Sequence, residues 1–490
     1  MFVKKEVINM EKEVRVRYAP SPTGYLHIGG ARSALFNYLY AKKYNGKLIF
    51  RSEDTDVARN IVGGEESQYN DLIWLGIIPD ESPFNPNPKY APYRQMERLD
   101  IYHQYIDQLL KEGKAYYCYC TEEEIEQRKQ EQLDSGIKAP KYDGKCLNLT
   151  QEQIDEYIKQ GRKPCVRIKL PRHHEYVFDD LVRGKMKFSS DDVGGDFVIM
   201  KSNGIPTYNF AVVIDDHLMD ITHVLRGEEH LSNTPKQLAI YEAFNWEAPK
   251  FGHMTIIVNQ DGKKLSKRDL NVLQFMSQYR EMGYLKEAIF NFILLLGWNG
   301  KDNKEIYSFD EAIVAFNPQY LSSAPSTFDV EKMKWMNSYY IKKLNDHDYL
   351  EFIKPQMAKA MDISKCDDSQ LLEIANMFKE ELSYGQEIVA PLKTIFSPEE
   401  IKDESLKDML NSSVSKQIFN GICDELKMLT EINQDTIKLV FKNVMKKLEI
   451  KGKNFYMPIR LKLTSCEHGI ELYNIIKILG VEETCNRLLK

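Results

Sequence analysis

A proline- and glycine-rich turn close to the start of the chain constrains the fold more than any other feature. It occupies residues 19–30 (APSPTGYLHIGG), between an alternating apolar and polar stretch at 14–18 and apolar residues at helical spacing over 31–43. This order predicts a strand, a turn and a helix, and residues 47–51 (KLIFR) predict a second strand. Such a unit of about 30 residues is typical of a βαβ crossover. We therefore expect a doubly wound parallel sheet, whose ligands bind at the carboxyl ends of the strands.

The chemistry of this turn suits a nucleotide phosphate. Its prolines fix the backbone, its glycines allow a ligand to approach the chain closely, and the N–H groups at the start of the helix face an anion. His27 can add a hydrogen bond from its side chain. A tight βα turn that needs glycine and proline for its geometry alone explains the same residues equally well, so both interpretations stay open at this point.

The rest of the chain predicts a sheet that is split by an insertion and followed by helices. Strand-like clusters recur far downstream, at residues 210–214, 222–225 and 254–258. Between the two groups of strands, the chain from about residue 85 to 204 is charged and alternating, which indicates an inserted α+β domain. From residue 270 onward, amphipathic patterns predict helices, for example at 350–361, 370–383 and 436–448. The predicted fold class is therefore α/β, with a Rossmann-type catalytic domain, an α+β insertion and an all-α C-terminal region.

A second glycine-containing turn, residues 261–268 (DGKKLSKR), carries four cations in six residues. On its own it is best explained as a solvated basic loop. Together, however, His27-Ile28-Gly29 and Lys264-Leu265-Ser266-Lys267-Arg268 resemble the paired signatures of class I aminoacyl-tRNA synthetases. The 240 residues between His27 and Lys267 leave room for the acceptor-binding insertion of that family.

Three further segments narrow the resemblance. Residues 17–24 (RYAPSPTG), 51–56 (RSEDTD) and 208–229 are similar to those of bacterial glutamyl-tRNA synthetases, and the similarity extends over nearly the whole chain. It implies an ATP-dependent ligase that joins L-glutamate to tRNA-Glu. It also implies five regions: two halves of the catalytic domain at 1–95 and 205–269, an acceptor-stem-binding domain at 96–204, a stem-contact domain at 270–340 and a helical anticodon-binding region at 341–490.

The resemblance assigns the glutamate pocket residue by residue. Arg17 and Arg226 are expected to bind the side-chain carboxylate, because a guanidinium is always charged and binds a carboxylate through two bonds. Glu53 is expected to bind the ammonium group, although a solvated acidic strand end is the alternative for this residue. Three more residues are expected to line the pocket and a fourth to close it: Ala19, Ser21 and Tyr208, and Glu229.

The resemblance also implies where ATP binds and how it reacts. The expected ATP-binding residues are His27, Gly29, Gly30, Lys264, Ser266 and Lys267. Gly30 stands where many members of the family have histidine, so we expect it to act as a spacer. His27, Lys264 and Lys267 are the expected catalytic residues, because they position the nucleotide and neutralise phosphate charge while the α-carboxylate of glutamate attacks the α-phosphate. Mg²⁺ is expected to accompany the ATP, and the 2′-hydroxyl of the terminal adenosine of tRNA to accept the glutamyl group.

Three cysteines in the predicted insertion indicate a metal site. Cys118 and Cys120 are followed by Cys146, 26 residues beyond Cys120. Thiolates suit Zn²⁺, which takes four ligands in a structural site. Some bacterial relatives have a histidine two residues after the third cysteine, but Asn148 stands there, and Tyr142 matches a tyrosine ligand of related glutamylating enzymes. We expect a structural Zn²⁺ on Cys118, Cys120, Tyr142 and Cys146. Three reduced cysteines in a domain that has lost its metal are the alternative.

The distribution of charge along the chain indicates where tRNA can bind. The net charge of −6 means that tRNA must be met by local cations, and eight cations against a single Glu449 within residues 438–462 predict a basic stripe. No arginine occurs in the helix expected at residues 377–384, where members of the family that reject tRNA-Gln carry one, so we expect tRNA-Gln to be charged as well.

We expect a cytoplasmic monomer. Its longest apolar stretch, residues 289–298, is about half the length that spans a bilayer, so no membrane segment is expected.

Two other functions stay open. A shorter glutamylating enzyme that modifies tRNA, or a small adenylate-forming ligase, would share the catalytic fold, but about 150 further residues of helical pattern argue against both. A tRNA-binding protein that has lost catalysis would keep the same domains, but the intact Arg17, His27, Glu53 and Lys267 argue against it.

Overall fold

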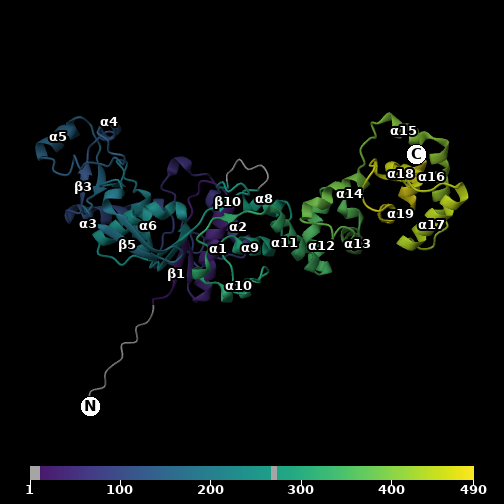
Figure 1. Cartoon of the computed structure of the whole chain (residues 1–490), viewed down its shortest axis with the longest axis horizontal. Coiled ribbons are helices and arrows are strands. Elements are labelled where there is room, and N and C mark those ends of the chain that lie inside the picture. The colour runs from purple at the N-terminus through teal and green to yellow at the C-terminus, as the bar shows by residue number, and fades with distance from the viewer. Residues whose placement is uncertain (1–11, 266–272) are drawn as a thin grey trace, which may run out of the picture. The chain divides into compact units, whose positions relative to one another are not determined.

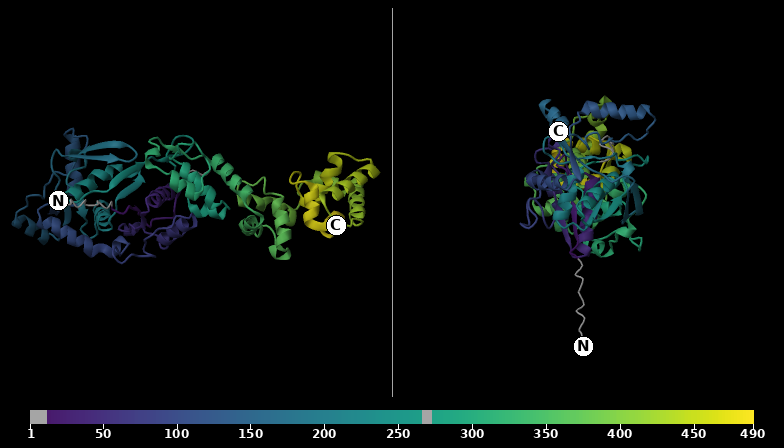
Figure 2. Two further views of the ribbon diagram at one scale, coloured as in Figure 1. Left: turned by 90° about the horizontal axis from the view of Figure 1, so that it is seen from below. Right: turned by 90° about the vertical axis from the view of Figure 1, so that its left-hand side faces the viewer.

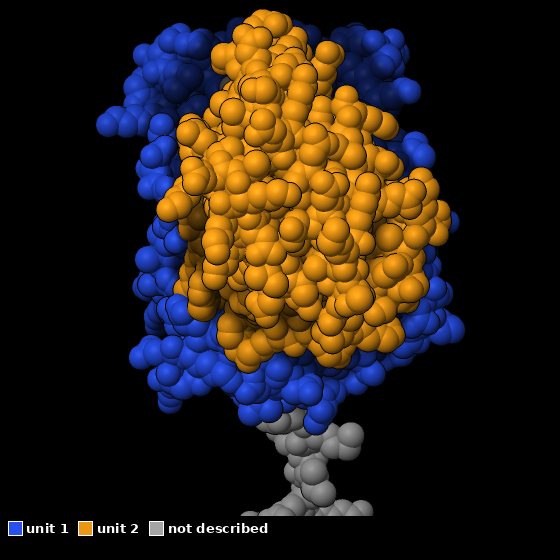
Figure 3. All heavy atoms as spheres, turned by 90° about the vertical axis from the view of Figure 1, so that its right-hand side faces the viewer, with its two compact units in different colours: residues 1–278, 289–330 blue, residues 279–288, 331–490 orange. Residues whose placement is uncertain are grey.

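The computed structural model describes residues 12–265 and 273–490 (Figures 1 and 2). The chain forms two compact units, which Figure 3 distinguishes by colour. The first unit comprises residues 1–278 and 289–330, and the second comprises residues 279–288 and 331–490. Across the described ranges, every helix is too short or too polar to cross a membrane.

A four-stranded parallel sheet organises the first unit. Its strands lie in the order β2–β1–β8–β9, with the bounds β1 (Arg15–Tyr18), β2 (Lys47–Phe50), β8 (His223–Gly227) and β9 (Lys250–Met254). Val16 of β1 pairs with His223 of β8, so strands far apart in the chain are neighbours. The helix α1 (Ile28–Lys43) connects β1 to β2, which confirms the predicted crossover. Because β2 lies on one side of the β1–β8 pair and β9 on the other, this pair is the switch point at which such sheets bind ligands.

One predicted strand is wrong and another is partly right. Residues 210–214 lie in the helix α6 (Tyr208–Leu218), in which every residue from Phe210 to Asp216 is buried. A short, continuous apolar run is compatible both with a buried strand and with an enclosed helix, and periodicity does not separate the two. In the stretch 254–258, β9 ends at Met254, and Ile257–Val258 form the short β10, which pairs with β11 (Ser326–Thr327).

An α+β region lies between the two halves of the parallel sheet, which confirms the predicted insertion. Its antiparallel sheet has the order β3–β4–β7, formed by β3 (Ala115–Cys118), β4 (Cys165–Ile168) and β7 (Val198–Met200). A separate hairpin joins β5 (Glu175–Asp180) to β6 (Gly184–Ser189). The helices are α3 (Leu99–Lys111), α4 (Glu122–Asp134) and α5 (Gln151–Lys159). Thr121 and Thr150 form capping boxes, which explains where α4 and α5 begin.

Further helices belong to the first unit or to both units. They are α2 (Gly64–Trp74), α7 (Thr234–Ala243), α8 (Met276–Glu281), α9 (Lys286–Leu295), α10 (Phe309–Ala315) and α11 (Val330–Lys343). The segment that contains α10 packs against α1, where the rings of Phe36 and Phe316 stack with their centroids 5.6 Å apart.

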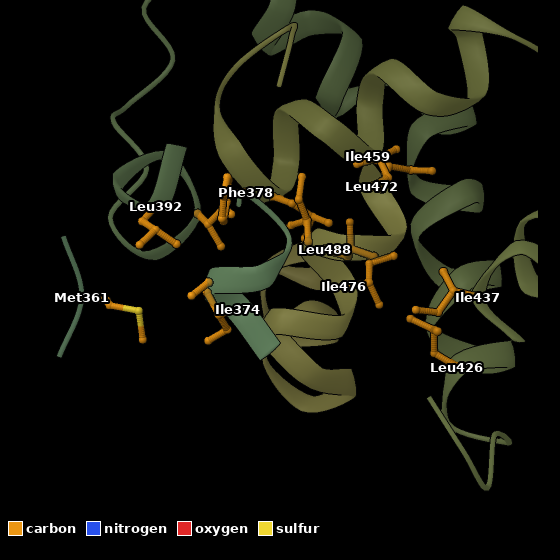
Figure 4. Packing of buried hydrophobic residues seen from close by; sticks show 14 of the residues in the cluster. Met361, Ile374, Phe378, Leu392, Leu426, Ile437, Ile459, Leu472, Ile476 and Leu488 are labelled. Carbon is orange, nitrogen blue, oxygen red and sulfur yellow. The ribbon is translucent and has the colours of Figure 1, made fainter. Parts of the chain in front are cut away.

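All the regular elements described within residues 344–490 are helices, which confirms the all-α prediction for this region. They are α12 (Asp346–Met357), α13 (Asp368–Asn376), α14 (Val389–Phe396), α15 (Glu404–Asn411), α16 (Ser413–Leu426), α17 (Gln434–Leu448), α18 (Lys453–Thr464) and α19 (Leu472–Leu489), with short 3₁₀ turns between some of them. Figure 4 shows part of their common apolar core, to which α13, α14, α16, α17, α18 and α19 contribute Ile374, Leu392, Leu426, Ile437, Ile459 and Ile476.

The helix predicted at residues 377–384 is wrong, because α13 ends at Asn376 and turns follow it. Phe378 and Leu382 have helical spacing and are buried. The N–H of Leu382 still donates to the carbonyl oxygen of Phe378 at 3.2 Å. The carbonyl oxygen of Ser383 instead accepts from the Nδ2 of Asn337 at 2.6 Å.

Candidate active site

One cavity collects all the described residues that are predicted to bind substrate. It has a volume of about 670 Å³ and lies at the carboxyl ends of β1 and β8, the expected switch point. Its lining includes Arg17, Ala19, Ser21, His27, Gly29, Gly30, Glu53, Tyr208, Arg226, Glu229 and Lys264. Ser266 and Lys267, which the sequence also predicts as site residues, lie outside the described residues.

His27 begins the helix α1 at the wall of the cavity. As the N-cap residue, it accepts a hydrogen bond at Nδ1 from the N–H of Gly30, 3.1 Å away. A neutral ring that accepts at Nδ1 carries its proton on Nε2, which is the donor expected from the sequence. The start of the helix adds partial positive charge, and the exposed Lys264 lines the same cavity. This part of the cavity therefore suits a phosphate group.

Gln68 of α2 holds the proline-rich turn in place. Its Nε2 donates to the carbonyl oxygens of Ser21 and Gly24 at 3.2 and 2.9 Å, and its Oε1 accepts from the hydroxyl of Tyr18 at 3.2 Å. The position of Tyr18 also explains why residue 30 is a glycine, because a Cβ there would lie 2.8 Å from the Tyr18 hydroxyl oxygen. Close packing under the turn therefore keeps this position free of a side chain.

A buried ionic network supports two of the cavity residues, Arg17 and Glu53. Arg51 is fully buried and donates to Asp216 at 2.7 Å and to Glu53 at 3.1 Å. The same oxygen of Asp216 accepts from the Nε of Arg17 at 3.4 Å. The Arg17 guanidinium makes no other hydrogen bond to a described residue, so the N–H groups of its two terminal nitrogens remain for a ligand.

Burial and neighbouring charges shift the pKa values of Glu53 and Asp216 in opposite directions. Burial raises the pKa of Glu53, although Arg51 and Arg17 act against the shift. Burial also disfavours the charge of Asp216, but Arg17 and Arg51 outweigh it and lower the pKa of that carboxyl. Glu53 is therefore the less stabilised anion of the two, and a bound ammonium ion would restore the balance of charge around it.

A further part of the wall comes from β8 and from the start of α6. Arg226 of β8 is 5% exposed and is one of the residues that line the cavity. The hydroxyl of Tyr208 shares a hydrogen bond of 3.2 Å with the Nδ1 of His230. Burial lowers the pKa of His230 to about 4, so its ring is neutral. Glu229 lies on the 3₁₀ turn Glu228–Asn233, and its carboxylate lies so close to Gly227 that a Cβ there would collide with it.

These groups define what the cavity can bind. Two guanidinium groups suit a carboxylate, Glu53 suits an ammonium group, and the start of α1 with His27 and Lys264 suits phosphates. The cavity thus matches an acidic amino acid beside a nucleotide.

The sequence did not predict the residues that support the cavity residues and the proline-rich turn through hydrogen bonds, directly or through another side chain. They are Arg51, Gln68, Asp180, Asp216, Thr234 and His253. A signal exists for Asp216, because a charge within an apolar run is rarely buried without a partner. Its partners come from distant segments, however, and sequence spacing does not reveal them.

The cysteine cluster, Cys118, Cys120 and Cys146, lies at the end of β3. Its sulfur atoms lie within 4.8 Å of one another, and those of Cys120 and Cys146 are 3.5 Å apart. Two sulfur atoms bound to one tetrahedral Zn²⁺ lie about 3.8 Å apart, so the cluster can hold such an ion. The Oη of Tyr142 lies 3.3 Å from the Sγ of Cys118 and 3.7 Å from that of Cys120. The guanidinium of Arg167 lies 3.8 Å from the centre of the Tyr142 ring and holds its orientation.

Of the eight cations that are predicted to form a basic stripe, six are exposed lysines on α17, just after it and at the start of α18. They are Lys438, Lys442, Lys446, Lys447, Lys451 and Lys453. Lys462 and Arg460 are half-buried instead, and the Nη1 of Arg460 donates to the carbonyl oxygen of Ile470 at 2.8 Å. Arg487 likewise donates to the carbonyl oxygen of Leu463 at 3.0 Å. Both arginines of residues 346–490 thus bind the backbone of their own unit.

Comparisons with known proteins agree with this architecture. Residues 13–335 match the family described as tRNA synthetases class I (E and Q), catalytic domain, and residues 346–490 match the family described as anticodon binding domain. The chain is 50% identical to a glutamate–tRNA ligase of Geobacillus thermodenitrificans over 484 residues, which cover 98% of each chain. It is 48% identical to that of Bacillus subtilis over 483 residues, which cover 98% of this chain and 99% of the relative.

A solved structure is similar over the same length. It is the crystal structure of a glutamate tRNA ligase from Elizabethkingia meningosepticum in complex with its amino acid. The match has a TM-score of 0.84 and 35% identity, and it covers 98% of this chain and 99% of the other.

Proposed function

The chain belongs to the glutamate–tRNA ligase family of class I tRNA synthetases, and we propose that its cavity is the place where glutamate is activated with ATP. As a member of this family, it uses L-glutamate, ATP and tRNA-Glu. The observation that carries the proposal is that Arg17, Arg226 and Glu53 line one cavity together with His27 at the start of α1.

In this proposal the glutamate-binding groups divide the charges of the substrate between them. Arg17 and Arg226 bind its side-chain carboxylate, and Glu53 binds its ammonium group. Ala19, Ser21 and Tyr208 line the pocket, and Glu229 closes it. The α-carboxylate is thereby left to face the nucleotide.

The α-carboxylate oxygen then attacks the α-phosphorus of ATP. The bond from this phosphorus to the bridging oxygen breaks, pyrophosphate leaves, and glutamyl-adenylate remains. Such a transfer depends on positioning and charge rather than on covalent help. His27 and the backbone at Gly29 and Gly30 hold the nucleotide, and Lys264 neutralises charge on the phosphates. Ser266 and Lys267 are assigned to the same task from the sequence signature. When bound, the Mg²⁺ that accompanies ATP adds further charge neutralisation.

The second half-reaction transfers the glutamyl group to the 2′-hydroxyl of the terminal adenosine of tRNA, and AMP leaves. We assign acceptor-stem binding to residues 96–204, further stem contacts to 270–340 and anticodon binding to 341–490. In the first of these regions, a structural Zn²⁺ on the cysteine cluster and Tyr142 would hold the end of β3 to the loop that follows α4. Since its substrates are cytoplasmic molecules, we place the enzyme in the cytoplasm, and we propose that it acts as a monomer.

We also propose that the enzyme charges tRNA-Gln. An arginine that rejects the tRNA-Gln anticodon would need a side chain that is free to reach it. The support for the proposal is that Arg460 and Arg487, the arginines of residues 346–490, are engaged with backbone carbonyl oxygens. Charging assays with the two purified tRNAs test this, and strict rejection of tRNA-Gln would refute it.

The function itself is tested by glutamate-dependent exchange between ATP and pyrophosphate, with and without tRNA-Glu. We expect exchange that requires tRNA and that is lost in Lys267→Ala. No exchange in either condition would leave the fold without this activity, and a tRNA-binding protein that has lost catalysis would then be the better conclusion.

A further inference from the structure

The guanidinium of Arg226 is held on two sides from behind the cavity. Its Nε donates to the Nε2 of His253 at 3.1 Å, and its Nη2 donates to the hydroxyl of Thr234 at 2.8 Å. Its Nη1 is also buried, yet it has no hydrogen-bond partner among the described residues. Nη1 is thus the guanidinium nitrogen that has no partner among the described residues, and Arg226 itself lines the cavity.

The bond from Arg226 determines the state of the His253 ring. A guanidinium only donates, so the Nε2 of His253 must accept and cannot carry a proton. The ring proton therefore sits on Nδ1, which lies 2.6 Å from the Oδ2 of Asp180. Both side chains are fully buried, and burial lowers the pKa of His253, in agreement with a neutral ring.

Asp180 is in turn fixed by backbone groups. It stands at the end of β5, where the hairpin turns toward β6, and its Oδ1 accepts from the N–H groups of Val182 at 2.9 Å and Arg183 at 3.0 Å. The next residue, Leu181, donates its N–H to the carbonyl oxygen of Phe251 on β9 at 2.9 Å. A continuous series of short bonds thus runs from the hairpin through Asp180 and His253 to Arg226.

We propose that His253, oriented by Asp180, is a positioning residue that sets the direction of the Arg226 guanidinium toward the side-chain carboxylate of glutamate. This inference rests on the proposed role of Arg226 in glutamate binding. Without an acceptor at the Nε2 position, the Nε of Arg226 is buried without a partner, and the guanidinium must turn away from the orientation that it has at the cavity wall.

Two substitutions separate the two nitrogens of the ring. The amide of His253→Asn can take the place of Nδ1 and keep the bond to Asp180, but it does not reach Arg226. The longer side chain of His253→Gln can present its amide oxygen at the Nε2 position. In ATP–pyrophosphate exchange with tRNA-Glu, we expect His253→Asn to raise the KM for glutamate by about tenfold with little change in kcat. We expect His253→Gln to restore the KM to within about threefold of the wild type.

A matched control is His223→Asn, because His223 is also buried but lies at the start of β8, away from the cavity. It should leave the KM for glutamate unchanged. Nuclear magnetic resonance on ¹⁵N-histidine-labelled wild type gives an independent reading, with His253 assigned by its loss in His253→Gln. We expect the proton on Nδ1. A proton on Nε2, or on both nitrogens, would overturn the inference even where His253→Asn does not fold.

Arg226→Lys distinguishes failure of the positioning role of His253 from failure of the proposed glutamate-binding role of Arg226. If Arg226→Lys raises the KM for glutamate but His253→Asn does not, the positioning role is refuted and the assignment of Arg226 stands. If Arg226→Lys also leaves the KM unchanged, Arg226 does not bind the substrate carboxylate, and the inference falls with it.

Discussion

Arg17→Lys tests whether the guanidinium of Arg17 binds the substrate, or only completes the buried network. Arg17 uses its Nε for Asp216, at 3.4 Å, and keeps its two terminal nitrogens for a ligand. A lysine keeps the positive charge beside Asp216, but its single ammonium group cannot also form two parallel bonds to a carboxylate. The substitution therefore removes substrate contacts while the charge of the network stays the same.

The size of the effect follows from the bonds that are lost. One hydrogen bond between charged groups contributes about 1.5–3 kcal/mol, and each 1.4 kcal/mol changes an affinity about tenfold. Loss of one such bond raises the KM for glutamate by about 10- to 150-fold. The kcat should change much less, because the carboxylate is bound equally in the ground state and in the transition state.

The assay is steady-state charging of tRNA-Glu at saturating ATP and tRNA, with glutamate varied. Arg15→Lys is a matched control, because Arg15 lies on the same strand, is equally buried and pairs with Glu81 outside the cavity. We expect the control to lose stability but to keep its KM for glutamate. A KM for Arg17→Lys within about threefold of the wild type would refute substrate binding by Arg17.

Three further results are expected. Tyr142→Phe removes the oxygen beside the cysteine cluster, so protein purified without added zinc should lose most of its Zn²⁺ by mass spectrometry; full retention would exclude Tyr142 as a ligand. Because burial raises the pKa of Glu53, the KM for glutamate should rise as the pH falls through that raised pKa, since the protonated carboxyl no longer attracts the ammonium group. A KM that stays constant down to the range of an ordinary glutamate would contradict this. Glu81→Gln leaves the buried Arg15 without the carboxylate that it meets at 2.8 Å, and unfolding measurements should show a loss of roughly 3 kcal/mol; an unchanged melting temperature would argue against the pair.

The parts of the molecule that could be predicted from the sequence are those in which one short segment carries both its structure and its chemistry. Residues 19–30 predict the turn between β1 and α1, and the same residues include His27, Gly29 and Gly30 on the cavity wall. The amphipathic pattern at 436–448 predicts α17 because its apolar residues have helical spacing and face one core.

The remaining parts depend on contacts between distant segments. Arg226 of β8 meets His253 only because β9 lies beside β8 in the sheet. Arg51, which directly follows β2, meets Asp216 of the helix α6, and 165 residues of chain separate the two. The apolar run at 210–214 predicts a strand, but these residues form part of the buried helix α6. A run of apolar residues shows that a segment is buried, but it does not show whether the segment is a strand or a helix.

The β5–β6 hairpin lies within the predicted insertion, yet its Asp180 is bonded to His253 of β9, which in turn accepts a hydrogen bond from Arg226 at the cavity. The inserted region is therefore not structurally independent of the parallel sheet. A chimera that replaced residues 96–204 with the matching segment of another synthetase would also replace one of the supports of Arg226. A graft of this kind should keep the hairpin of the recipient, or bring an aspartate to the same turn.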